Sequence, residues 1–278
     1  MSSLDQTKSL DVLIPTFRRP TALATTLTSL FGQTFRDFDV IIADQSDVNL
    51  DDGQVELTTL KRAFALRGQS VRHLRRPSRQ GMAEQRHFLL GEARAPFVLF
   101  LDDDVLLEPD VVGRMIGVLR AEDCGFVGMA PIGLSHVDDV RPHEQQIELW
   151  DGPVQPEDYV FETVPWQRYK LHNAANPLHL GWTYARNQTV RYKVAWVGAC
   201  VMYDRGKLID VGGFSWWKEL PEEHCGEDVL AELLVMRKYG GCGVLPSGVY
   251  HLELPTTVPN RRYNTNDLIR KYLGSVGG

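Results

Sequence analysis

This sequence lacks the segments that would send a protein into or across a membrane. Its N-terminal stretch has no apolar core of signal-peptide length, and its longest apolar runs, such as residues 95–101, are far too short to span a bilayer. Only four cysteines occur, widely spaced and without a CxxC pair. We therefore expect reduced thiols and a cytoplasmic protein without a transmembrane segment, with peripheral contact to a membrane left open.

An excess of basic residues is also missing. The 278 residues include 30 Lys and Arg against 36 Asp and Glu, which gives a formal net charge of −6. Because a nucleic-acid binder would show a basic balance or a basic stripe, we expect no nucleic-acid partner. Hydrophobic residues make up 43% of the chain, enough for a packed core in one α/β domain.

Short apolar runs alternate with helical periods along most of the chain. They predict strands at residues 10–17, 39–44, 71–76, 96–102 and 193–203, and one strand or two short strands at 242–251. They predict helices at residues 20–31, 55–68, 81–94, from 108 onward, 227–239 and 267–273. This alternating order predicts a mostly parallel sheet with helices on both sides. Residues 131–191 show no such pattern.

Three aspartates, Asp102, Asp103 and Asp104, follow the apolar strand at residues 96–102. In parallel sheets, ligands bind at the carboxyl ends of the strands. Three adjacent carboxylates repel one another, and a hard divalent cation such as Mg²⁺ or Mn²⁺ would compensate their charge. A solvated acidic turn that caps the next helix is the alternative, but the position of the cluster favours a functional site.

Three further features of the sequence suggest a function only if they lie beside such a site. Glu227 and Asp228 begin a helix, where acids favour the macrodipole, so a role as general base needs further support. His251 follows an apolar strand, and a lone histidine is more often structural than a metal ligand. Gly81 begins a helix after a strand, where it is either an ordinary turn glycine or a point at which the backbone approaches a phosphate.

Trp216 and Trp217 form an aromatic pair after a Gly-Gly-Phe turn. Exposed tryptophans can stack on sugar rings, whereas a buried aromatic pair is the commoner arrangement.

Taken together, these segments resemble the family 2 glycosyltransferases of the GT-A fold. The similarity covers residues 10–130 and 193–251, and its most specific parts are the Asp102–Asp104 segment, which matches the family's DxD motif, and the Glu227-Asp228 helix start, which matches its "ED" motif. Two positions depart from the family pattern. The usual Asp-Asp-Gly-Ser reads Asp44-Gln45-Ser46-Asp47, and the Asn of the Asn-x-Gly stretch is Arg79.

The resemblance implies a GT-A type of α/β fold with a Rossmann-like, mostly parallel central sheet flanked by helices. A smaller mixed sheet would lie on the acceptor side. Residues 1–130 would form the half that binds the nucleotide sugar, and residues 131–255 would form the acceptor half. Residues 256–278 would form a C-terminal tail able to move and close over the donor.

The resemblance also assigns roles to individual residues. Asp228 would be the general base, with Glu227 as the alternative. Mn²⁺ or Mg²⁺ would be held by Asp104, His251 and Asp102, and Trp216 and Trp217 would lie on the acceptor side. The nucleotide-sugar donor would be bound by Pro15, Thr16, Phe17, Arg19, Asp44, Gln45, Arg79, Gly81, Arg86, Asp102 and Asp103.

The implied function is metal-dependent, inverting transfer of a sugar from a nucleoside diphosphate sugar, with a UDP-sugar favoured. The acceptor hydroxyl would belong to a carbohydrate, a lipid-linked molecule or a small molecule, as in glycan or glycoconjugate biosynthesis. One alternative is a sugar-nucleotide pyrophosphorylase, which normally opens with a Gly-x-Gly-Thr-Arg-like loop where this chain has Pro15-Thr16-Phe17-Arg18. Another is a non-catalytic nucleotide-sugar-binding protein, against which the presence of both Asp104 and Asp228 argues.

Overall fold

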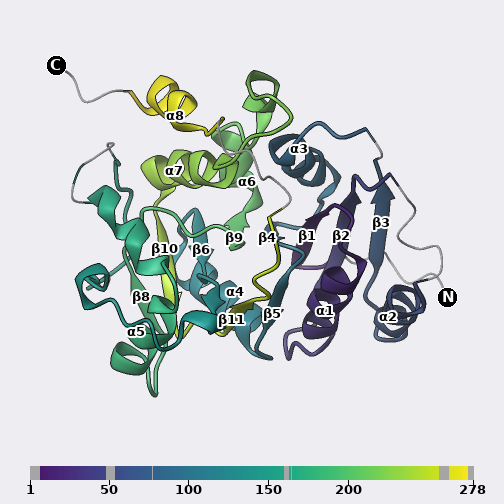
Figure 1. Ribbon diagram of the computed structural model, residues 1–278, viewed down its shortest axis with the longest axis horizontal. Helices are drawn as coiled ribbons and strands as arrows, with labels where there is room; N and C mark the ends of the chain where they lie inside the picture. The colour runs from purple at the N-terminus through teal and green to yellow at the C-terminus, as the bar shows by residue number, and fades with distance from the viewer. Residues whose placement is uncertain are drawn as a thin grey trace.

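Two β-sheets organise the chain (Figure 1). The computed structural model describes residues 7–47, 54–76, 78–159, 163, 165–256 and 263–274. Within them, the large sheet has eight strands in the order β3-β2-β1-β4-β9-β6-β10-β8. Their bounds are β1 (Leu10–Thr16), β2 (Phe38–Asp44), β3 (Val71–Arg75), β4 (Phe97–Leu101), β6 (Phe126–Gly128), β8 (Val190–Tyr192), β9 (Cys200–Asp204) and β10 (Gly241–Leu245).

The large sheet is mostly parallel, as the sequence predicts. Strands β3, β2, β1 and β4 run parallel, and so do β6 and β10, whereas β9 and the edge strand β8 are antiparallel to their neighbours. The small sheet is mixed and consists of β5 (Val105–Leu107), β11 (Val249–His251) and β7 (Ile132–Gly133). The predicted α/β architecture with a second, smaller mixed sheet is therefore confirmed.

Helices cover both faces of the large sheet (Figure 1). The helices that the structure describes are α1 (Pro20–Phe31), α2 (Val55–Leu66), α3 (Met82–Glu92), α4 (Val111–Glu122), α5 (Asn176–Tyr184), α6 (Arg205–Asp210), α7 (Glu227–Tyr239) and α8 (Asn266–Leu273), with 3₁₀ helices η1 (Leu134–His136), η2 (Pro142–Glu144), η3 (Pro165–His172) and η4 (Ser215–Glu219). Within the described ranges, none is long and apolar enough to cross a membrane.

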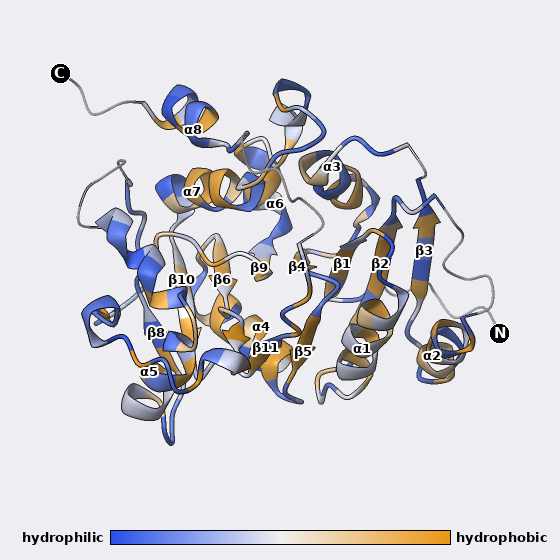
Figure 2. Cartoon of the chain, viewed as in Figure 1, coloured by the Kyte–Doolittle hydropathy of each residue, from blue (hydrophilic) through white to orange (hydrophobic). Residues whose placement is uncertain are grey.

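Strand β1 shows why both faces need covering. Successive side chains of a strand point to opposite faces. Val12 and Ile14 pack into the core beneath α1, α2 and α4, while Leu13 packs into the core beneath α3 and α7. Because the central strands are apolar on both sides (Figure 2), each face must be buried by helices. The carboxyl ends of the strands therefore form a defined edge between the two helical layers.

The strand predicted at residues 193–203 is wrong over its first seven residues, because β9 begins only at Cys200. Gly198 and Ala199 have φ angles of 72° and 53°, in the left-handed region that a strand cannot adopt. The backbone N–H groups of Val197 and Gly198 donate to the side chain of Glu232 instead of to a neighbouring strand. The other predicted strands and helices are present with bounds shifted by a few residues, and residues 242–251 form two short strands.

The segment without a clear sequence pattern, residues 131–192, folds around buried polar groups. Arg168 is 7% exposed, and its Nη2 lies 2.7 Å from Glu148 Oε1 while its Nη1 lies 3.2 Å from Glu157 Oε2. A buried guanidinium needs such partners, because leaving it unpaired would be costly. This requirement explains why the segment mixes charged and aromatic residues and shows no simple periodicity.

His172 in this segment should make the fold acid-sensitive. Burial lowers the pKa of His172 to about 4, whereas histidine in an unfolded chain titrates near pH ~6.5. Below that pH the unfolded state binds a proton that the folded state does not, so this contribution to stability is complete above pH ~6.5 and is lost as the pH falls toward 4. We expect the free energy of unfolding, measured with urea, to fall by about 2–3 kcal/mol more in the wild type than in His172→Gln between pH ~7 and ~4.5. If the free energies of unfolding of the wild type and of His172→Gln changed in parallel with pH, this assignment would be contradicted.

Candidate functional site

A cavity of about 330 Å³ opens at the carboxyl ends of β1 and β4 and reaches the first turn of α7. This is the edge of a parallel sheet at which ligands bind, and the volume is in the range of small-molecule sites. Its wall is formed by Pro15, Thr16, Phe17, Arg19, Met82, Gln85, Arg86, Asp102, Asp103, Asp104, His224, Cys225, Gly226, Glu227, Asp228, His251, Leu254 and Thr256.

The three aspartates after β4 form the acidic side of this cavity. Asp104 Oδ2 lies 2.6 Å from Arg19 Nη1, and Asp103 Oδ2 accepts a hydrogen bond from Thr16 Oγ1 at 2.6 Å. Burial, reinforced by the neighbouring carboxylates, raises the pKa of Asp103 to about 7, although Thr16 and Arg19 act in the opposite direction. The guanidinium group of Arg19 thus lies beside the carboxylates of both Asp103 and Asp104.

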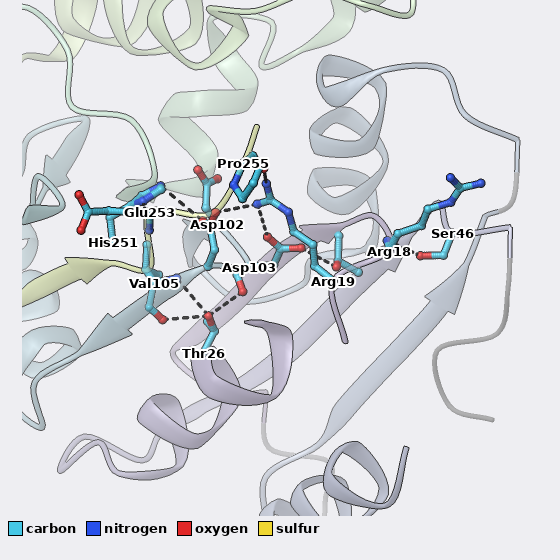
Figure 3. A network of polar contacts seen from close by, with 12 residues as sticks. Arg18, Arg19, Thr26, Ser46, Asp102, Asp103, Val105, His251, Glu253 and Pro255 are labelled. Atoms are coloured by element: carbon cyan, nitrogen blue, oxygen red, sulfur yellow. Dashed lines mark hydrogen bonds and ion pairs between the residues drawn. The ribbon is translucent and has the colours of Figure 1, made fainter. Parts of the chain in front are cut away.

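The backbone of the acidic turn is fixed from α1. The hydroxyl of Thr26 is buried and lies 2.9 Å from the carbonyl oxygen of Asp103 and 2.8 Å from that of Val105 (Figure 3). The backbone N–H of Val105 in turn donates to this hydroxyl at 3.2 Å. Thr26 therefore helps to hold the backbone from which the aspartate side chains extend.

Arg86 joins the two acidic parts of the site. This buried side chain lies 3.1 Å from Asp102 Oδ1 through Nη2 and 3.0 Å from Glu227 Oε1 through Nε. Burial alone would lower the pKa of Arg86, but the charges of Asp102 and Glu227 raise it above its ordinary value. Arg86 therefore stays cationic and holds the start of α7 against the end of β4.

The two acids that begin α7 are used differently. Glu227 is 5% exposed and is ion-paired with Arg86. Asp228 is half-buried, lines the cavity and accepts a hydrogen bond from the backbone N–H of Val229 at 2.9 Å, and it makes no ion pair among the described residues. Of the two carboxylates, Asp228 is the one available to a ligand in the cavity.

The donor set suits a hard cation, but the ligands are not assembled. Carboxylate oxygens of Asp102 and Asp104 and the imidazole of His251 are suitable ligands for Mg²⁺ or Mn²⁺. In the described part of the chain, however, no three His, Cys, Asp or Glu side chains converge on one ion position. His251 Nε2 is 3.7 Å from Asp104 Oδ1, and Arg19 occupies the other carboxylate oxygen of Asp104.

The tautomer of His251 is set by its own loop. The backbone N–H of Glu253 donates to His251 Nδ1 at 2.8 Å, so the neutral ring carries its proton on Nε2 (Figure 3). A metal bond from Nε2 would require that proton to leave and the Glu253 contact to break. The conformation described here is therefore one in which Arg19, and not His251, neutralises Asp104.

The structure brings most of the predicted site residues to this one cavity. Those that line it are Pro15, Thr16, Phe17, Arg19, Arg86, Asp102, Asp103, Asp104, Glu227, Asp228 and His251. Those that do not line it are Asp44, Gln45, Arg79, Gly81, Trp216 and Trp217.

Asp44 and Gln45 are buried in contacts within the protein. Asp44 Oδ1 accepts from the backbone N–H of Ser46 at 2.8 Å, and its Oδ2 lies 3.1 Å from His73 Nε2. Burial alone would raise the pKa of Asp44, but these hydrogen bonds lower it below its ordinary value. Gln45 donates to Glu84 Oε2 at 3.1 Å.

The backbone around Gly81 is used for packing against the loop before α7. Gly81 has a φ of 90°, and a Cβ there would lie 2.6 Å from His224 Cε1. His224 Nε2 in turn accepts a hydrogen bond from the backbone N–H of Ala83 at 3.1 Å. The first turn of α3 is thus capped by this imidazole. Sequence analysis missed His224, which lies in a polar loop without any motif.

Trp216 and Trp217 pack inside the protein and away from the cavity. Trp216 is 3% exposed and its ring centroid lies 5.9 Å from that of Phe214. Trp217 is partly buried, with its ring centroid 6.4 Å from that of His87. Trp216 therefore matches the buried arrangement that the sequence left open.

Comparisons with known proteins agree with this fold. The sequence profile described as "Glycosyl transferase family 2" matches residues 11–191. A protein of Haemophilus influenzae (strain ATCC 51907 / DSM 11121 / KW20 / Rd) described as an uncharacterized glycosyltransferase is 27% identical over 111 residues. That match covers 40% of this chain and only 34% of the relative, about a third of its length.

Solved structures of similar fold share little sequence identity with this chain. The crystal structure of residues 1–349 of S. aureus TarS is 14% identical with a TM-score of 0.56, covering 87% of this chain and 60% of that chain. The mannosyltransferase PcManGT from Pyrobaculum calidifontis, in complex with GDP-Man and Mn²⁺, is 15% identical with a TM-score of 0.52, covering 86% and 57%. These likenesses confirm the expected GT-A type of fold. The family profile matches well over half of the residues of this chain, so the chain belongs to glycosyl transferase family 2.

Proposed function

We propose that this protein transfers a sugar from a nucleoside diphosphate sugar, with a UDP-sugar favoured, to an acceptor hydroxyl with inversion at the anomeric carbon. One observation carries the proposal. The aspartates after β4 and Asp228 at the start of α7 line the same cavity, at the sheet edge where ligands bind. Family membership supports this reading, as does the similar fold of TarS, whose structure is also known in complex with UDP-GlcNAc.

The acidic side of the cavity would face the pyrophosphate of the donor. Asp104 and Asp102, with His251, would hold Mn²⁺ or Mg²⁺, which neutralises charge developing on the leaving nucleoside diphosphate. Arg19 would release Asp104 and place its guanidinium beside a phosphate oxygen, since planar guanidinium groups suit phosphate. Asp103, held by Thr16, would face the ribose.

Asp228 would act as the general base. An inverting displacement needs a carboxylate beside the acceptor hydroxyl, on the side opposite the leaving group. Asp228 is half-buried in the cavity wall and carries no ion pair among the described residues, so its oxygens can accept the hydroxyl proton. Glu227 is the weaker candidate, because its carboxylate is already ion-paired with Arg86.

The remaining assignments complete the proposal. Residues 1–130 would bind the donor, and residues 131–255, including the small mixed sheet, would bind a carbohydrate, lipid-linked or small-molecule acceptor. The tail at 256–278 would close over the donor, although residues 257–262 and 275–278 lie outside the described part of the chain. Within that tail, α8 packs on α7, whose first turn supplies Asp228. We propose that the protein acts in the cytoplasm.

Calorimetric titration with UDP, UDP-GlcNAc and GDP-Man, each with and without Mn²⁺, tests donor binding. A nucleotide that binds more tightly with Mn²⁺ would support the proposal, and release of free UDP or GDP from the bound donor would establish group transfer. Binding without any release, in the presence of glycan acceptors, would favour a non-catalytic binding protein. Formation of a nucleoside triphosphate from donor and pyrophosphate would instead indicate a pyrophosphorylase.

A further inference from the structure

A fully buried glutamate on α7 has no place in the chemistry proposed above. Glu232 is 0% exposed and lies one helical turn after Asp228. Its Oε2 accepts a hydrogen bond from the backbone N–H of Val197 at 2.6 Å, and its Oε1 accepts one from the backbone N–H of Gly198 at 2.8 Å. Both oxygens of one carboxylate are thus bound by two successive amides.

These two amides belong to a tight turn before β9 that is strained. Gly198 and Ala199 both have left-handed backbone angles, which is unusual for alanine. Such a conformation persists only where the surroundings impose it. The carboxylate of Glu232 supplies the two hydrogen bonds that a neighbouring strand would otherwise provide.

The same turn touches both chemical parts of the cavity. A Cβ built on Gly198 would lie 2.8 Å from Asp228 Oδ2, so the glycine backbone packs directly against the proposed base. The carbonyl oxygen of Ala199 accepts a hydrogen bond at 2.8 Å from the backbone N–H of Asp102, the first residue of the acidic cluster. The turn at residues 197–199 therefore lies between Asp228 and the end of β4 and sets the distance between them.

We propose that Glu232 is a positioning residue for the transfer reaction, which holds the 197–199 turn so that the Asp228 carboxylate faces the reacting centre of the donor. This role rests on the proposed function. Its burial supports a specific use, because a carboxylate removed from water costs free energy unless its oxygens accept hydrogen bonds, as both oxygens of Glu232 do. A less costly side chain could fill the space but could not accept from both amides.

The substitution Glu232→Gln separates the effect of the carboxylate from the effect of the side-chain shape. Glu232→Gln keeps the volume but replaces one acceptor oxygen by an NH₂ group, which then faces a backbone N–H donor. We expect the turn to shift and UDP release from the donor to slow roughly 10- to 100-fold, with the donor KM unchanged. Glu232→Asp, which keeps the charge but is too short to reach both amides, gives an independent second variant.

Asp11 provides a matched control at the other end of the sheet. Its buried Oδ2 also accepts from two successive amides, Arg94 N at 2.7 Å and Ala95 N at 2.9 Å. Asp11 lies near the start of β1, whereas the cavity lies beyond its carboxyl end. Asp11→Asn likewise removes a buried carboxylate charge, but its remaining oxygen can still accept from both amides, so turnover per UDP-binding site should not change.

A double-mutant comparison with Asp228→Asn decides between positioning and mere stabilisation. If Glu232 acts through Asp228, Glu232→Gln should change turnover less than about 2-fold in the Asp228→Asn background. Turnover is measured as UDP release from UDP-GlcNAc, or as GDP release from GDP-Man, per site that binds the nucleotide. Equal losses in both backgrounds, equal losses in Asp11→Asn, or unchanged turnover in both Glu232 variants would each overturn the proposal. A wild type that binds nucleotide but releases none from any donor would overturn the proposed function first, before any variant is compared.

Discussion

Asp228→Asn should reduce turnover roughly 100-fold or more while leaving the affinity for UDP nearly unchanged. Asparagine keeps the size of the side chain and its hydrogen bond from the Val229 amide, but it cannot accept the proton of an acceptor hydroxyl. The substitution therefore removes only the chemical role. UDP release measured at saturating donor gives the turnover, and calorimetry with UDP and Mn²⁺ gives the affinity.

Glu227→Gln is the matched comparison, one residue away. Glu227 is tied to Arg86, so its loss should disturb the packing of α7 against β4 and have a smaller effect on turnover at equal donor saturation. If Glu227→Gln were inactive while Asp228→Asn kept full activity, the roles assigned to the two residues would have to be exchanged. Activity retained in both would mean that neither carboxylate is the base.

Asp104→Ala should abolish the gain in UDP affinity that Mn²⁺ provides. Asp104 is 4% exposed at the end of the acidic turn, and its carboxylate is the one nearest to His251. Without it, two of the three proposed ligands remain, too few to fix an ion against the donor. UDP titrations with and without Mn²⁺ should then give the same dissociation constant.

Asp37→Ala is the control for the loss of an acidic side chain. Its side chain is 52% exposed and contacts Ser9, near the amino end of the sheet and away from the cavity. This variant should keep the full Mn²⁺ effect. An undiminished Mn²⁺ effect in Asp104→Ala would show that the cation is held elsewhere or that Arg19 alone neutralises the donor.

The positions of the main chemical groups could be predicted from the sequence because they follow strand ends. Strand β4 is a continuous apolar run and β1 is apolar from Val12 to Pro15, so their carboxyl ends are easily located, and Asp102 to Asp104 follow β4 at once. Parallel strands bring such ends to one edge. Asp228 could be expected near them only because the Glu227-Asp228 helix start resembles the "ED" motif of the family.

Contacts between distant segments could not be predicted in the same way. Asp44 also follows a strand end, yet His73 and Ser46 hold it inside the protein. The apolar run before Cys200 looks like a strand, but Glu232 binds its amides from a helix more than 30 residues later. Such pairings depend on how elements pack, and no local periodicity records them.

The most direct test of the central claim is a crystal structure of the protein with UDP and Mn²⁺. We predict UDP in the cavity between β1, β4 and α7, with an ion bound to Asp104 and to a phosphate oxygen, and with Asp228 facing the open end of the diphosphate. UDP bound at another surface, or a diphosphate placed away from Asp104 with no ion between them, would contradict the account.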